Sequence, residues 1–249
     1  MRNKIWTFDS RKLEISVCSL NGRVCRTSKL PAEVKNVNQL CQFDPEHVTV
    51  GTKNGLFLYD DKTLSCTRIS DGDRRNVCVT TSKTLLACGD DDDKISSYKW
   101  LEDELIFDGD VKFKSRREFS GIQLVGSTIY AGKSGHSFIG AYVVDLKGKK
   151  EVLHTCRSKP PEKWFDDDCD TGMRICDVDS AGNLLVCSND ANFIAIRKNK
   201  QGDSWKRLKF ENTDDIEQPV DAHFTEDERV FVLHGPESDE ITEFILVDD

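Results

Sequence analysis

The chain has 249 residues, of which 37% are hydrophobic and 32% are charged, and its formal net charge is -9 at pH 7. The acid excess argues against a dedicated DNA or RNA binder, because binding of phosphates requires an excess of Lys and Arg. No apolar run approaches the roughly 18 residues of a transmembrane helix, so no membrane association is expected. The start, "MRNKIWTFDSRK", lacks the apolar region of a signal peptide. We therefore predict a cytoplasmic or nuclear location.

Six hairpin-like segments follow one another along the chain. Each has an apolar strand, a polar turn and a second, alternating strand, as in "VTVGTKNGLFLYDDKT" and "LLACGDDDDKISSYKW". The other four are "IWTFDSRKLEISVCSLNG", "IYAGKSGHSFIGAYVVDLKG", "LLVCSNDANFIAIRKNKQG" and "VFVLHGPESDEITEFILVDD". Successive turns start 38 to 56 residues apart, at Asp9, Gly51, Gly89, Gly132, Ser188 and His234. This near-constant spacing indicates an internal repeat.

Most hairpins are flanked by two more strand-like runs, such as "VNQLCQFD" before and "LSCTRIS" after the second one. Four short strands in about 40 to 45 residues are the period of one propeller blade. No segment has sustained helical periodicity, so we predict an all-β chain. The expected fold is a single propeller domain over residues 1–249 with six four-stranded blades. The first repeat lacks its innermost strand and the last its outermost one, which predicts a ring closed by the two termini.

The two best hairpins, "LLACGDDDDKISSYKW" and "VTVGTKNGLFLYDDKT", resemble the central strands of WD40 repeats. Tyr59-Asp60 and Val144-Asp145 stand where that family has its Trp-Asp pair. The Gly-His dipeptide and the Trp-Asp pair themselves are missing. The segment "VGTKNGLFLYD" also resembles citron-homology propellers. Both resemblances imply a non-catalytic scaffold that binds other protein subunits in a multiprotein complex and is monomeric by itself.

Acidic residues and cysteines are the candidate metal ligands in this sequence. Asp90 to Asp93 fall in an expected hairpin turn, where Asp is favoured for local reasons. Most of the ten cysteines recur at equivalent repeat positions, and no CxxC pair occurs. We therefore predict free thiols that fill core positions, with no metal and no cofactor. The recurring positions are Cys41, Cys78 and Cys176 in first strands, Cys88 and Cys187 ending second strands, and Cys25, Cys66 and Cys156 in fourth strands.

Catalytic patterns are missing from the sequence. None of the five histidines lies in an HxxxH or HExxH pattern, and no GxSxG, P-loop or Rossmann motif occurs. His223, in "PVDAHF", is expected to be a buried, hydrogen-bonded core residue. We therefore predict that the chain is not an enzyme. The alternative is a propeller hydrolase with its active site in a central channel.

One aromatic insertion and one basic run provide a candidate partner-binding surface. The insertion "SKPPEKWFDDDCD" carries two adjacent aromatic residues, and the basic run is "KFKSRR". The WD40-like topology implies that both lie in loops on one rim, where the aromatic pair would anchor a protein partner. The alternative is that the tryptophan folds back onto a blade. The predicted partner-binding residues are Trp164, Phe165, Lys112, Lys114, Arg116 and Arg117.

Overall fold

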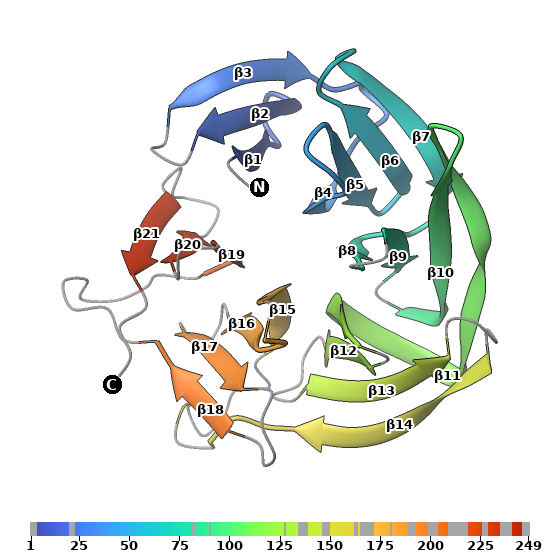
Figure 1. Cartoon of the computed structure of the whole chain (residues 1–249), viewed down its shortest axis with the longest axis vertical. Coiled ribbons are helices and arrows are strands. Elements are labelled where there is room, and N and C mark those ends of the chain that lie inside the picture. Colours follow the sequence, from blue (N-terminus) through green and yellow to red (C-terminus); the bar gives the residue numbers. More distant parts are fainter. Residues whose placement is uncertain are drawn as a thin grey trace. The chain divides into compact units, whose positions relative to one another are not determined.

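The structure of this chain is a computed structural model. It describes residues 4–19, 23–80, 83–89, 91–126, 128–133, 139–145, 150–161, 164, 172–179, 181–188, 193–198, 204–208, 219–225, 229–234 and 241–245. These residues form 21 strands, and strands adjacent in a sheet pair antiparallel wherever a register is defined (Figure 1). The all-β prediction is confirmed. The described part of the chain contains no helix long and apolar enough to cross a membrane.

The chain divides into two compact units, Met1–Glu118 with Asp145–Glu151, and Phe119–Val144 with Val152–Asp249. The first unit begins with a three-stranded sheet of β1 (Lys4–Asp9), β2 (Glu14–Ser19) and β3 (Val24–Lys29). A four-stranded sheet follows, with β4 (Val37–Gln42), β5 (His47–Thr52), β6 (Gly55–Asp60) and β7 (Ser65–Asp71). Next come β8 (Asn76–Val79), β9 (Thr84–Cys88), β10 (Asp91–Leu101) and the first part of the long β11 (Glu104–Val125), which continues from Phe119 on into the second unit.

The second unit continues the same succession of hairpins. It holds β12 (Thr128–Lys133), β13 (Ile139–Asp145) and most of β14 (Lys150–Ser158). A four-stranded sheet follows, with β15 (Arg174–Val178), β16 (Leu184–Ser188), β17 (Phe193–Lys198) and β18 (Ser204–Arg207). The last sheet has three strands, β19 (Asp221–Phe224), β20 (Arg229–Leu233) and β21 (Ile241–Ile245).

The expected six separate blades are not confirmed. The described residues form five sheets, because β8 to β14 make a single seven-stranded sheet. Its central strand, β11, pairs with β10 through residues such as Leu105 and Val111, and with β12 through residues such as Leu124. Two expected strands are thus one continuous strand. The three-stranded first and last sheets agree with the expected incomplete repeats, while closure of a ring by the termini stays a prediction.

The middle strands of the sheets, such as β5, β9 and β16, are buried on both faces, so the core lies on either side of them. In the β5–β6 hairpin, the Thr52 hydroxyl accepts the N–H groups of Asn54 and Gly55 at 3.1 and 3.0 Å, which closes the short turn. Within each unit, apolar side chains from consecutive sheets pack together. In the first unit Ile15 of β2 shares a cluster with Val50 and Phe57 of the next sheet. In the second, β16, β17, β19 and β20 contribute to one cluster.

Glycines permit close approach between consecutive sheets. A Cβ on Gly51 would lie 2.6 Å from the carbonyl oxygen of Arg74. In the second unit, a Cβ on Gly121 would lie 2.4 Å from the carbonyl oxygen of Ile175, and Gly121 has a φ of +116°. Any other residue there would clash with the neighbouring backbone and be strained as well. These glycines therefore fix how near the first strand of each following sheet can come.

Candidate functional site

Polar side chains near irregularities in the strands form hydrogen bonds from one sheet to the first strand of the next sheet. In the first unit, the Gln39 side-chain oxygen accepts the Val77 N–H at 3.0 Å. In the second, the Gln123 amide donates to the Cys176 carbonyl at 3.3 Å. Asp177 repeats this arrangement, because its Oδ2 accepts the Phe224 N–H at 3.1 Å. Register shifts end at Gln39 and at Asp177 and one residue before Gln123, and such bulges redirect side chains away from the regular ladder.

At Asp177 this inter-sheet contact includes a histidine. The Asp177 Oδ2 lies 3.4 Å from Nδ1 of His223 on β19, and the Asp221 Oδ2 lies 3.7 Å from the other ring nitrogen, Nε2. Asp177 is held in place, because its Oδ1 also accepts the Val178 N–H at 2.8 Å. The Asp177 side chain is 8% exposed, whereas that of His223 is 51% exposed. A buried, fixed carboxylate thus orients a solvent-accessible imidazole. We call Arg174, Asp177, Asp221 and His223 the His223 cluster.

The charges in the His223 cluster stabilise one another. Burial acts to lower the pKa of His223, but the charge of Asp221 and the hydrogen bond to Asp177 outweigh it and raise the pKa to about 10. Burial acts to raise the pKa of Asp221, but the charges of Arg174 and His223 outweigh it and lower the pKa to about 2. At neutral pH the cluster therefore contains an imidazolium next to an ionised Asp221.

This arrangement can hold and transfer a proton. A carboxylate that fixes one ring nitrogen sets the orientation of a histidine and leaves the other nitrogen for chemistry. Here Asp177 lies at Nδ1, and Nε2 faces the Asp221 carboxylate at the longer distance of 3.7 Å. The described residues contain no group of three or more His, Cys, Asp or Glu side chains suited to hold a metal ion. The expectation that His223 is a buried core residue is wrong, since half of its side chain is exposed.

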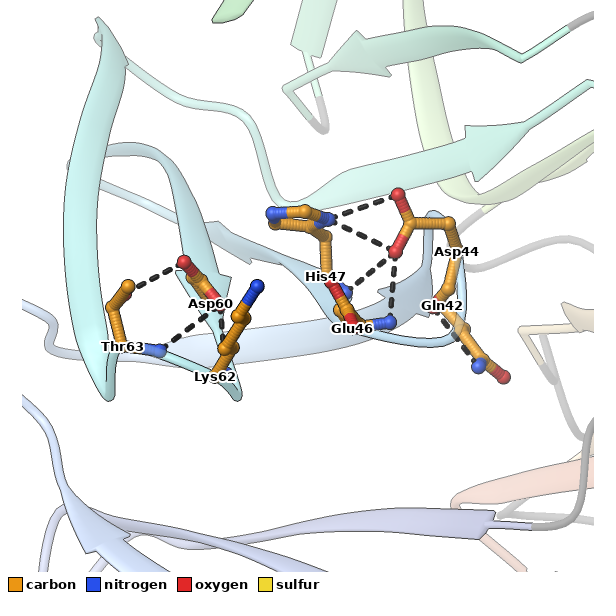
Figure 2. A network of polar contacts seen from close by, with 7 residues as sticks. All are labelled: Gln42, Asp44, Glu46, His47, Asp60, Lys62 and Thr63. Atoms are coloured by element: carbon orange, nitrogen blue, oxygen red, sulfur yellow. Dashed lines mark hydrogen bonds and ion pairs between the residues drawn. The ribbon is translucent and has the colours of Figure 1, made fainter. Parts of the chain in front are cut away.

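A second Asp–His pair lies in the first unit, at the β4–β5 turn (Figure 2). The His47 Nδ1 lies 2.9 Å from both carboxylate oxygens of Asp44, and the His47 ring packs on Trp100 with centroids 4.8 Å apart. Asp44 also accepts the N–H groups of Glu46 and His47, both at 2.8 Å. The neighbouring Asp60 closes the β6–β7 turn in the same manner. This network stabilises turns, and both members of the pair are only 17% exposed.

The predicted partner-binding residues lie in different elements. Trp164 is half-buried and packs edge-on against Phe193, with ring centroids 5.7 Å apart, whereas Phe165 lies outside the described residues. The basic residues Lys112, Lys114, Arg116 and Arg117 lie in strand β11 rather than in a loop. The side chain of Lys112 is exposed, and those of the other three are outside the described part.

The acidic run and the cysteines are partly as expected. Asp91 to Asp93 lie in strand β10, where Asp92 pairs with Arg117, so the expected turn is wrong for these three residues. The eight described cysteines are free thiols, as predicted. Two of them are close together, since the sulfur atoms of Cys176 and Cys187 lie 3.2 Å apart.

Comparison with known proteins identifies the fold class. The sequence matches no protein-family model and no curated protein. A protein of unknown function from Bacteroides caccae is similar in structure, with a TM-score of 0.70, 9% identity, and coverage of 96% of this chain and 89% of that one. Streptogramin B lyase has a TM-score of 0.64 and 12% identity, with coverage of 99% and 80%. An auxiliary nutrient binding protein from Bacteroides thetaiotaomicron has a TM-score of 0.66 and 12% identity, with coverage of 93% and 64%.

These similarities show the fold alone, which is all-β and propeller-like. The WD40 resemblance stays a prediction. The expectation that the chain is not an enzyme is contradicted, because the similar structures include streptogramin B lyase and a luciferin-regenerating enzyme. The expected cytoplasmic or nuclear location is also contradicted. The fold occurs in an auxiliary nutrient binding protein and in the extracellular domain of a one component system, both from B. thetaiotaomicron.

Proposed function

We propose that this chain is a propeller enzyme that acts on a small polar substrate at the His223 cluster, with His223 as the proton-transferring residue. The observation that supports this most is the half-exposed His223 between two carboxylates from adjoining strands. Asp177 holds the ring in place, and Nε2 delivers the proton. Asp221 and Arg174 set the charge around it. The presence of lyases among proteins of this fold is consistent with proton-transfer chemistry.

The experiment compares substrate turnover by wild type and by His223→Gln. Each protein is incubated with an extract of small metabolites, and every component is followed by mass spectrometry. We expect wild type to consume at least one metabolite, and the variant to do so about 100-fold more slowly, since loss of a general acid–base group typically costs a factor of about 10² to 10⁴. His47→Gln is the matched control, because it removes an Asp-paired imidazole that is not part of the cluster. No change in any metabolite, or equal rates for all three proteins, would overturn the proposal.

A protein-binding role is the second candidate. It is supported by exposed apolar side chains on β10 and β11, with Leu101 53%, Ile106 44% and Phe107 56% exposed. Lys112, from the predicted partner-binding set, is exposed on the same strand β11. We propose that such a partner contacts this strand, with Trp164, Phe165, Lys114, Arg116 and Arg117 as further candidates. An Ile106→Ser/Phe107→Ser variant that stays folded should capture less partner than wild type from a lysate. Equal capture of every protein would contradict this surface.

We also propose that the seven-stranded sheet represents two blades that share β11, which gives six blades in all. The change of partner along β11 supports this, since its first part pairs with β10 and its last part with β12. The register with β12 is interrupted between Phe119 and Ile122, where a strand would turn from one blade to the next. An experimental structure in which β8 to β14 form one undivided blade would contradict it.

A further inference from the structure

We propose that Cys176 and Cys187 form a redox-sensitive pair that a peroxide converts reversibly into a disulfide. The two residues lie on adjacent antiparallel strands of one sheet, β15 and β16, and their sulfur atoms are 3.2 Å apart. A disulfide bond is about 2.05 Å long, so the sulfur atoms need to approach by little more than one ångström. Side-chain rotation can supply such a shift, whereas thiols on distant strands would require movement of the backbone.

The local register explains why these two thiols meet. Cys187 pairs with Arg174, while Cys176 lies at the register shift between Ile175 and Asp177 and has no direct cross-strand partner. This bulge leaves the Cys176 side chain directed to its diagonal neighbour. Both residues are buried, at 1% and 2% exposure. The Cys176 thiol is also 3.7 Å from the Arg174 carbonyl, which shows that it is held within the sheet.

The reaction is balanced with hydrogen peroxide as the oxidant. One thiolate attacks a peroxide oxygen, which forms a sulfenic acid and releases hydroxide, and the second thiol then displaces water from the sulfenic acid. In total two thiols and one peroxide give one disulfide and two waters. Burial raises the pKa of the Cys176 thiol well above its usual value, so its thiolate is scarce. Oxidation is therefore expected to be slower than modification of Cys25, which is exposed.

The position of the pair connects it to the His223 cluster. Cys176 directly precedes Asp177, the residue that fixes the His223 ring. A disulfide would join β15 to β16 at the bulge that directs Asp177 toward β19. Oxidation is thus expected to alter the environment of His223 without contact between sulfur and substrate. The dithiol itself stands independently of the proposed enzymatic function, because it depends only on the geometry of β15 and β16.

The experiment maps disulfides in the intact protein. Accessible thiols of the native reduced protein are first blocked with an alkylating agent, and the protein is then treated with hydrogen peroxide. After denaturation, the remaining thiols are labelled with a second, heavier reagent and the peptides are analysed by mass spectrometry. We expect a peptide pair linked through Cys176 and Cys187, which a reducing agent separates. The midpoint of thermal unfolding should rise on oxidation of wild type and stay unchanged for Cys187→Ser.

Two results would overturn the proposal. One is recovery of Cys176 and Cys187 with the second label after peroxide treatment that is prolonged far beyond the time needed to oxidise Cys25 fully in an unblocked sample. The other is a linked peptide in which either residue is joined to a different cysteine. If Cys187→Ser does not fold, the peptide map of wild type still decides. Equal turnover by wild type and His223→Gln would overturn the proposed function and leave the disulfide map unaffected, so the two proposals fail separately.

Discussion

Replacement of His223 by Gln should destabilise the protein in a pH-dependent manner. The folded protein raises the pKa of this group from 6.5 to about 10, through the charge of Asp221 and the hydrogen bond to Asp177 against the opposing effect of burial. The imidazolium therefore stabilises the folded state fully below pH 6.5, and this contribution is lost as the pH rises through about 10. Glutamine keeps hydrogen-bonding capacity without the charge, so the variant should lack the pH-dependent contribution of His223 to the free energy of unfolding.

The size of the effect follows from the shift and from the exposure of the ring. Each pKa unit corresponds to about 1.4 kcal/mol, which sets an upper limit near 5 kcal/mol. Because 51% of the side chain is exposed, water screens the ion pairs, and we expect about 1 to 2 kcal/mol at pH 6. Near pH 10 and above, the free energies of unfolding of variant and wild type should become equal.

The assay is urea unfolding of both proteins at pH 6, 8 and 10, because effects of pH on other groups are largely shared and cancel in the difference. The charged groups that face His223 are Asp177 and Asp221, and the charge of Arg174 acts on Asp221. Asp221 stays ionised across this range, since its pKa is lowered to about 2. An NMR titration of the imidazole provides an independent readout. A pH-independent difference in unfolding free energy, or a His223 that titrates near pH 6.5, would refute the reasoning.

Three further variants test the surrounding structure by urea unfolding. Gly121→Ala should lower the free energy of unfolding by about 3 kcal/mol or more, because its Cβ would lie 2.4 Å from a backbone oxygen at a φ of +116°. Gly126→Ala is the control and should cost about 1 kcal/mol, because Gly126 has a φ of +62° and its Cβ would lie in open space. Equal costs would contradict the close approach at Gly121. The ionised Asp221 should stabilise the folded wild type by about 2 kcal/mol above pH 3.8, and this stabilisation is lost as the pH falls through about 2. Asp221→Asn should lack this contribution to the free energy of unfolding. A variant that loses stability as steeply as wild type in acid would count against it. Trp164→Ala should cost about 1 to 2 kcal/mol through its edge-on contact with Phe193; unchanged stability would show that the contact contributes nothing.

The hairpins could be predicted from the sequence because their signals are local. In "VTVGTKNGLFLYDDKT", apolar residues alternate on both sides of a turn that contains Asn54 and Gly55, and β5 and β6 meet there. The sequence does not predict β11 as one strand, because its middle, "KFKSRR", is a charged run that is typical of a loop. In the structure the backbone of this run pairs with the start of β10, for example Arg117 with Asp92.

The His223 cluster could not be predicted from spacing alone. Asp177 and His223 are separated by a full repeat, and their contact depends on how closely β15 and β19 approach. A usable signal was present, since "ICDVD" and "VDAHF" are the first strands of consecutive repeats and both carry ionisable residues. An acid at such a position is costly unless it meets a partner. Opposite charges at equivalent positions of neighbouring repeats therefore indicate a contact such as that between Asp177 and His223.

The position of Asp177 permits structure and chemistry to be separated in one experiment. Gln39 likewise accepts a backbone N–H of the next sheet through a neutral amide oxygen, so the contact itself requires no charge. Asp177→Asn should keep an oxygen for the Phe224 N–H and lose only one backbone hydrogen bond, at a cost of about 1 kcal/mol measured at pH 10. The pKa of His223 should fall, because one carboxylate partner is gone. A folded variant in which NMR finds the His223 pKa unchanged would show that Asp177 serves the fold alone.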